Sequence, residues 1–414
     1  MRVLGVKVKK IIEGNVFCGY YDLHPLSKDN RFILLHKAKF NDREVQANDY
    51  VEIVIYDLEK DIGEVIDQTL AWNWQQGSRL QWVGLELNRY IAYNSFDVNN
   101  GILHGVIYDS YEKKSTKIDM PIYSISSCGN VVISYDFNRM YKARKAYSYA
   151  VCESSSGEVV NNKGVGISVY DINKKTKNNI VLIEDLIAFK PETSMDFGCH
   201  WVDSPIFREG DSEIIFLHRW IKSDGFYSRL YAVNIDGSNL RLLNDSGVVN
   251  HIDTRGNHVL FDGFGSNSVN SIRKYSFVSK SFKYLLPFYH MLANRMPKVR
   301  SRLLTHYYYL TNIDSGEEIA ILKSLPSVAH PSLSPLADGQ FLSDTYEMKD
   351  LHRYLYLCNT KTNKYILLLK QYSPKEYNGT EYRCDLHPKW SIDGGKYTVD
   401  FIENSERKVL VSDF

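Results

Sequence analysis

Hydrophobic and polar residues alternate along the chain in short stretches, with the period of two that is typical of β-strands. Apolar stretches such as "RFILLHK" and "EIIFLHR" are followed by alternating ones such as "VEIVIYD" and "RLYAVNI". These stretches are separated by turns such as "SKDN" and "SIDGG". Turns containing Asp, Asn and Gly between short alternating strands are hairpin signals. The pattern therefore predicts an all-β chain built from hairpins.

Four strands recur at intervals of roughly 40 to 60 residues, which is the signature of β-propeller blades. We expect one β-propeller domain over residues 1–414 with about seven four-stranded blades. Their approximate limits are 16–60, 62–118, 119–185, 186–245, 246–325, 326–370 and 371–414. The N-terminal "VLGVKVKKII" is expected to pair with the last blade and close the ring, because closure removes exposed sheet edges.

One segment does not fit the strand repeat. "PFYHMLANRMPKVRSRLLTH", near 287–306, has helical apolar spacing and several basic residues. We interpret it as a short helical insertion in the fifth blade. It is either a helix packed on the rim, or a lid or docking element for a partner or an anionic surface.

The composition of the chain excludes some classes of partner and predicts where the protein is located. The 414 residues carry a formal net charge of +1, which argues against a nucleic-acid or anionic-membrane partner. No apolar run approaches the roughly 18 residues of a membrane span, and none at the start resembles a signal sequence. The six cysteines form no CxxC pair, so we expect reduced thiols and a cytoplasmic location. The 30 Tyr, 18 Phe and 6 Trp suit both β-strands and the aromatic walls of sugar-binding clefts.

The candidate chemistry lies at the start of each blade. In a propeller the innermost strands line the central channel, so the residues just before them would share one mouth of that channel. The polar residues in this register are Tyr20, Asp22, His24, Gln75, Gln76, Arg79, His200, Asp203, His251, His330, Asp385 and His387. Convergent imidazoles with a carboxylate suit a divalent transition metal. The alternative is structural, since a His before a Pro can bind a neighbouring carbonyl, and His24 is the strongest case.

The stretch "WNWQQGSRLQW" (72–82) is unusual for a strand. Tryptophan rings can stack on sugars, and the side chains of Gln75, Gln76 and Arg79 can hydrogen-bond to hydroxyls. Packing of the tryptophans between blades is the alternative.

Blades four to seven resemble the oligogalacturonate lyase family of seven-bladed propellers, which is related to the Tol-system propeller. The family has a catalytic His in His-x-x-x-x-Pro, and "HWVDSP" places His200 there. It has a histidine in each of the next two blades, where "VNHIDTRGNHVLF" supplies His251 and "HPSLSP" supplies His330. Its last blade carries Gln-x-x-His-x-His-Pro. The corresponding "YRCDLHP" keeps His387 but has Asp385 and Tyr382 in place of the earlier His and the Gln.

This resemblance implies that His200 is a catalytic base and that His251, His330, Asp385 and His387 hold a metal. Asp in place of His makes the ligand set harder, which favours manganese, magnesium or calcium. The expected cofactor is therefore a divalent metal, with manganese as the first candidate. Tyr382 in place of the Gln removes one possible ligand, so either the substrate differs from that of the family or the metal is lost. Tyr382 itself is a candidate substrate contact.

Three functions remain open. The first is a lyase that cleaves uronate-containing glycans by β-elimination, with Arg219 and Arg79 as candidate clamps for substrate carboxylate or hydroxyl groups. The second is another metal-assisted glycan reaction, hydrolytic or transferring, with Asp385 or Asp203 as acid or base. The third is a non-catalytic propeller that binds a glycan or scaffolds other enzymes.

The chain also resembles propeller proteins associated with bacterial surface-polysaccharide gene clusters, in "GYYD", "WQQG", "FLHRW" and "DLHPKWS". This resemblance points to an oligo- or polysaccharide substrate and to contact with polysaccharide-biosynthesis enzymes.

Overall fold

A computed structural model describes residues 2–3, 8–155, 162–222, 225–263 and 307–414. Its strands form seven antiparallel sheets in which strands consecutive in sequence are neighbours, except that the two N-terminal strands join sheets formed by the C-terminal part of the chain. The fold is an all-β, seven-bladed propeller of four-stranded blades, so the predicted fold class is confirmed. The predicted helical insertion near 287–306 lies outside the described residues. In the part of the chain that is described, no helix is long and apolar enough to cross a membrane.

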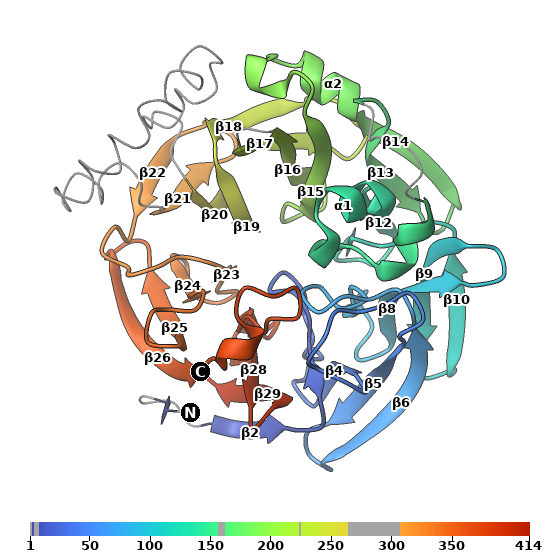
Figure 1. The fold of residues 1–414 in the computed structure, drawn as a ribbon, viewed down its shortest axis with the longest axis vertical. Coiled ribbons are helices and arrows are strands. Elements are labelled where there is room, and N and C mark those ends of the chain that lie inside the picture. The colour runs from blue at the N-terminus through green and yellow to red at the C-terminus, as the bar shows by residue number, and fades with distance from the viewer. Residues whose placement is uncertain (1, 4–7, 156–161, 223–224, 264–306) are drawn as a thin grey trace. The chain divides into compact units, whose positions relative to one another are not determined.

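The backbone divides into two compact units, and the first covers Met1–Glu158, Val169–Asn178 and Ala329–Phe414. Its first sheet contains β3 (Val16–Phe17), β4 (Phe32–Lys37), β5 (Val51–Asp57) and β6 (Ile62–Thr69), with β4, β5 and β6 side by side in Figure 1. The second contains β7 (Gln81–Val83), β8 (Tyr90–Asp97), β9 (Ile102–Asp109) and β10 (Lys114–Ile118).

Two further sheets of this unit come from the C-terminal part of the chain. One contains β23 (Pro331–Leu333), β24 (Gln340–Asp344), β25 (His352–Asn359) and β26 (Lys364–Tyr372), with β1 (Arg2–Val3) as a fifth strand. The other contains β27 (Lys389–Trp390), β28 (Lys396–Glu403), β29 (Glu406–Asp413) and β2 (Val8–Ile12). The N-terminal strand β2 thus pairs with β29 and supplies the fourth strand of the last blade (Figure 1).

The second unit covers Val159–Ser168 and Asn179–Val328. One of its sheets contains β15 (Cys199–Phe207), β16 (Glu213–Lys222), β17 (Gly225–Asn234) and β18 (Arg241–Gly247). Another contains β19 (Val249–Arg255), β20 (His258–Gly263), β21 (Tyr307–Asn312) and β22 (Glu318–Ile321). The residues of the remaining sheet belong partly to each unit: β11 (Ser124–Ile125), β12 (Val131–Ser134), β13 (Val165–Asp171) and β14 (Thr176–Leu182).

The strand pattern did not predict the helical segments. They are α1 (Phe137–Ala143), α2 (Ile183–Ala188) and the 3-10 turns η1 (Lys145–Tyr147), η2 (Ala150–Ser155), η3 (Thr193–Met195) and η5 (Lys375–Tyr377). Asp136 starts α1, because its side chain accepts from the backbone N–H groups of Asn138 and Arg139. The segment from α1 to η2 lies between β12 and β13 in the sequence and forms one wall of a pocket described below.

Apolar side chains fill the space between neighbouring sheets of the first unit. Phe17 and Leu34 of the first sheet pack with Ile91 of the second, and Trp72 and Trp74 belong to the same buried cluster. The two indole N–H groups donate to the carbonyls of Asp49 and Arg43. The structure therefore uses both tryptophans in the core.

Polar side chains on the second strand of several blades bind the loop that enters the next blade. In the first unit, His36 accepts from the backbone N–H of Ser78 at 2.9 Å, and Asn94 accepts from that of Ile122 at 2.6 Å. Asp344 and Asp400 do the same for His387 and Cys18, at 3.2 and 2.9 Å. Such bonds fix the position of each entering loop, which is where the candidate chemistry lies.

Candidate metal centre

A buried group of three potential metal ligands lies in the first unit. His330 stands directly before β23, while Asp385 and His387 belong to the loop that leads into β27. One ligand atom from each residue lies within 4.8 Å of the others, and all three residues are buried. The two imidazole rings are 4.4 Å apart at 80°. Two nitrogen donors and one carboxylate oxygen are a ligand set that divalent transition metals accept.

Asp344, the last residue of β24, orients the ring of His330 and holds the backbone of His387. Its carboxylate accepts the backbone N–H of His330 at 2.8 Å and lies 3.0 Å from the Nδ1 of the same residue. Its other oxygen accepts the backbone N–H of His387 at 3.2 Å. A carboxylate on Nδ1 fixes the tautomer and leaves Nε2 as the atom for a metal.

The third group, Asp385, is held by two arginines. Arg353 of β25 binds one carboxylate oxygen, and Arg383 donates to the other from Nε at 2.9 Å. Burial alone would raise the pKa of Asp385, but the charges of Arg383 and Arg353 outweigh it and hold that pKa well below its usual range. The carboxylate is therefore ionised, as a metal ligand must be.

His387 is suited to metal binding in protonation state and position. Burial, followed by the influence of His330, lowers the pKa of His387 well below its usual value, so the imidazole is neutral. Its Nε2 is buried and has no hydrogen-bond partner among the described residues. Its backbone has a φ of 41°, which few residues other than glycine adopt, and Asp344 holds its amide in place. The donor set present thus fits a divalent metal.

Two tyrosine rings and a buried ion pair contact the histidines of the metal-ligand group. The ring of Tyr20 lies 5.0 Å from that of His387, and the ring of Tyr21 lies 5.3 Å from that of His330. In addition, Lys389 donates to the carbonyl of His387 at 2.8 Å and pairs with Asp400 at 3.2 Å. Of the predicted substrate contacts, Tyr20 is therefore beside the group.

Of the other residues predicted to bind substrate in this unit, Asp22, Arg79 and Gln75 have side-chain partners within the protein, whereas Gln76 does not among the described residues. Arg79 forms a buried two-pronged ion pair with Asp22, with both distances 2.9 Å, and also donates to the carbonyl of Tyr123. Gln75 donates from Nε2 to the carbonyl of Arg383 at 3.2 Å. Gln76 is buried, and both atoms of its side-chain amide lack a hydrogen-bond partner in the described part of the chain.

Tyr382 is partly buried. Its ring packs against Tyr377 at 5.9 Å, and its carbonyl accepts from Arg407.

The predicted base, His200, is in the second unit. It lies on β15, is fully buried and stacks in a line of rings with His218 and Trp220. Its Nδ1 is 3.0 Å from the Nε2 of His218, and its Nε2 is 2.9 Å from the carbonyl oxygen of Met195. Both ring nitrogens are therefore engaged in the described structure.

The other predicted residues of the second unit also have buried partners. Arg219 pairs with Asp203 at 2.8 Å. The backbone N–H and the Nδ1 of His251 both contact the same oxygen of Asp262, at 2.9 and 2.8 Å. The structure groups His330, Asp385 and His387 within one unit, and the place of His251 among the ligands stays a prediction.

Sequence reasoning missed Asp344, Arg353 and Arg383. Arg353 stands within a strand, and Arg383 directly precedes the motif, so neither shares the register that singled out the histidines. Asp344 had a signal, because an Asp ends or follows the apolar core of the second strand in "LFDG", "FLSD" and "TVDF".

The fold and this group define a seven-bladed β-propeller with a buried His/Asp/His set that could hold a metal. No known protein-family model matches the chain, and no curated protein matches it in sequence. Solved structures do share its fold.

An oligogalacturonate lyase in complex with manganese is 12% identical, with a TM-score of 0.64 over 100% of this chain and 95% of that one. The oligogalacturonate lyase of Vibrio parahaemolyticus is also 12% identical, with a TM-score of 0.61 over 98% and 92%. The β-propeller domain of the Trilobed protease from Pyrococcus furiosus, again 12% identical, gives 0.52 over 92% of each chain. At these identities the likeness concerns the fold, which lyase and peptidase propellers share.

Proposed function

We propose that this protein is a metal-assisted enzyme that cleaves uronate-containing oligo- or polysaccharides by β-elimination. The observation that carries the proposal is the buried group of His330, Asp385 and His387, whose ligand atoms lie within 4.8 Å of one another. The likeness in fold to a lyase solved with manganese is consistent with it. A cytoplasmic location and contact with polysaccharide-biosynthesis enzymes stay predictions from the sequence.

β-Elimination needs a proton to be removed from the carbon next to the uronate carboxylate, and that proton is weakly acidic. A divalent metal, when bound, would neutralise the substrate carboxylate and so acidify it. His330 and His387 would supply neutral nitrogen ligands, and Asp385 an anionic oxygen. Asp344 orients the ring of His330 and holds the backbone of His387, and Arg353 with Arg383 keeps Asp385 ionised.

For the base, we retain His200 as the proposal. Its ring nitrogens contact Met195 and His218, so these contacts must open before a substrate proton can reach the imidazole. A general base contributes about 10²- to 10⁴-fold to a rate. His200→Asn should lower kcat by that amount while leaving manganese affinity unchanged. If the variant yields less folded protein but its kcat per folded molecule is unchanged, His200 is a structural residue.

The activity test is incubation with a panel of uronate-containing oligosaccharides and manganese, followed by the ultraviolet absorbance of the unsaturated product. The wild-type protein should form product, and His387→Ala should not. His104→Ala is the matched control, because His104 lies on β9 of the same unit and contacts the carbonyl of Ile102. If no member of the panel yields product with metal supplied, the lyase proposal fails.

One observation favours a second function, a non-catalytic glycan-binding propeller. Both oxygens of Asp385 bind arginines, so the group has a charge-balanced arrangement of its own. In that case the purified protein would contain no metal, and His387→Ala would leave glycan binding unchanged. Metal analysis of the purified protein separates the two functions.

A further inference from the structure

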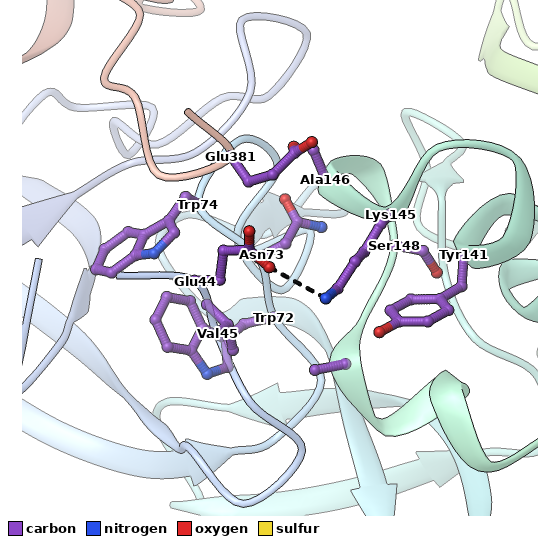
Figure 2. Close-up of a pocket in the computed structure, with 11 residues that line it drawn as sticks. Glu44, Val45, Trp72, Asn73, Trp74, Tyr141, Lys145, Ala146, Ser148 and Glu381 are labelled. Atoms are coloured by element: carbon purple, nitrogen blue, oxygen red, sulfur yellow. Dashed lines mark hydrogen bonds and ion pairs between the residues drawn. The ribbon is translucent and has the colours of Figure 1, made fainter. Parts of the chain in front are cut away.

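A separate pocket, open to solvent on one side, lies in the first unit (Figure 2). One wall comes from the loop around Trp72, Asn73 and Trp74, and the opposite wall from the segment that carries α1 and η1. Glu44 and Glu381 add two carboxylates. The enclosed cavity is only about 30 Å³, so a sugar unit bound here would insert one edge and lie mostly at the open mouth of the pocket.

Asn73 points to a missing ligand in this pocket. The side chain is only 5% exposed, and its Oδ1 accepts the backbone N–H groups of Gln75 and Gln76 at 3.0 and 2.7 Å. These two bonds fix the orientation of the amide, because only the oxygen can accept. The Nδ2 is buried and has no hydrogen-bond partner among the residues that the structure describes. A buried donor without a partner is costly, so an acceptor from a ligand would stabilise it.

The other groups in the pocket define the chemistry of that ligand. Lys145 pairs with Glu44 at 3.1 Å, which leaves the carboxylate of Glu381 as excess negative charge (Figure 2). The indole N–H groups of Trp72 and Trp74 are already bound to carbonyls, and both side chains are buried, so they form an apolar wall with little open surface. An apolar wall, one amide donor and carboxylate acceptors suit a polyhydroxyl ring. The excess negative charge disfavours an acidic sugar.

The pocket and the metal group share structural elements. Gln75, which follows Asn73, donates to the carbonyl of Arg383, and the side chain of Arg383 binds Asp385. Arg383 also donates to the hydroxyl of Tyr147 at 2.9 Å, and the neighbours of Tyr147 in sequence, Ala146 and Ser148, line the pocket. The loops that carry the two sites are therefore linked by hydrogen bonds.

We propose that this pocket binds one uncharged glycosyl unit of the same glycan. A ring or hydroxyl oxygen would accept from the Nδ2 of Asn73, and a hydroxyl would donate to Glu381. The inference that the glycan also carries an acidic unit rests on the proposed function, whereas the binding of a neutral sugar here does not.

The test is calorimetric titration with lactose, cellobiose and maltose, and separately with digalacturonate, in the presence of a metal chelator. At least one neutral disaccharide should bind, and digalacturonate should bind at least tenfold more weakly under these metal-free conditions. Asn73→Asp keeps the acceptor and removes the donor, so it should weaken binding of the neutral sugar at least tenfold. Glu381→Gln, at an exposed residue, should weaken it about three- to tenfold without affecting the fold.

Glu376→Gln is the matched control, because Glu376 is exposed on the nearby turn η5 and does not line the pocket. Its affinity should equal that of the wild type. The inference is overturned if no neutral disaccharide binds, or if both pocket variants bind as tightly as the control. Because the titration contains no metal, a failed lyase assay leaves its outcome unaffected, and the reverse also holds.

Discussion

The pairs His330–Asp344 and His251–Asp262, one in each unit, are built in the same way. In both, an aspartate on the next strand contacts the backbone N–H and the Nδ1 of the histidine, at 2.8 and 3.0 Å in the first pair and 2.9 and 2.8 Å in the second. The pairs differ in what else the aspartate holds. Asp344 also accepts the backbone N–H of His387, whereas Asp262 accepts the side-chain amide of Asn250.

The His–Asp pair alone is a structural feature, and further ligands are needed to make it a metal site. The His–Asp pair is a way for a blade to fix an imidazole at the start of its inner strand. Metal-binding capacity appears where a second histidine and an ionised aspartate join it, and among the described residues that occurs at His330, Asp385 and His387. The repeated histidine positions therefore mark places where a metal site can form. Whether one forms depends on the ligands that the neighbouring loops supply.

Among the residues that contact the ligands without binding the metal themselves, the largest effect is expected for Asp344→Asn. This change removes the anionic acceptor that orients the ring of His330 and holds the backbone of His387, and losses of this kind lower metal affinity about 10- to 100-fold. Calorimetric titration with manganese measures the change, and circular dichroism checks that the variant is folded. An unchanged affinity in a folded variant would mean that Asp344 does not orient the ligands.

His36 is a buried histidine without a carboxylate partner, and it should make the stability of the protein depend on pH. Burial lowers the pKa of His36 to about 3, and its Nε2 accepts the backbone N–H of Ser78. The folded protein therefore favours the neutral ring, while the unfolded chain takes up a proton below a pH of about 6.5. Stability from this residue is complete above that pH and is lost as the pH falls toward 3.

Between pH 7 and pH 5 this loss amounts to about 2 kcal/mol. Urea unfolding of the wild type and of His36→Gln at both pH values measures it, because the stability difference between them should shrink by that amount at pH 5. A difference independent of pH would mean that His36 can bind a proton in the folded state.

The smallest effect is expected for Asp262→Asn. If His251 is a ligand, as the sequence predicts, loss of its carboxylate partner should weaken manganese binding by up to about tenfold. The effect should stay below that of Asp344→Asn, because Asp262 contacts one predicted ligand and Asp344 contacts two. Identical affinities of this variant and the wild type would remove His251 from the ligand set.

The sequence was most informative where the signal was local. Alternation of apolar residues and turn chemistry predicted the seven four-stranded blades, since a strand's pattern is set by its own neighbours. The repeat register also picked out His330, Asp385 and His387 before their proximity was known. Their partners were not predictable in this way, because Arg353 and Arg383 contact Asp385 from 32 and 2 residues away and only the fold defines those contacts.

For the aromatic stretch around Trp72, the sequence was less informative. Its composition suggested a sugar-binding surface, and the structure places both tryptophans in the core between two sheets. The polar residue between them, Asn73, retains the unpartnered donor. Composition thus identified a segment of interest, but the burial of each side chain decides which residue can meet a ligand.

The central claim is that His330, Asp385 and His387 form a metal site. Calorimetric titration of the metal-free protein with manganese, for the wild type and for His387→Ala, tests it most directly. We predict one ion per chain for the wild type and a loss of affinity in the variant greater than the 10- to 100-fold typical of a residue that only orients a ligand. No binding by the wild type, or equal binding by the variant, would contradict the account.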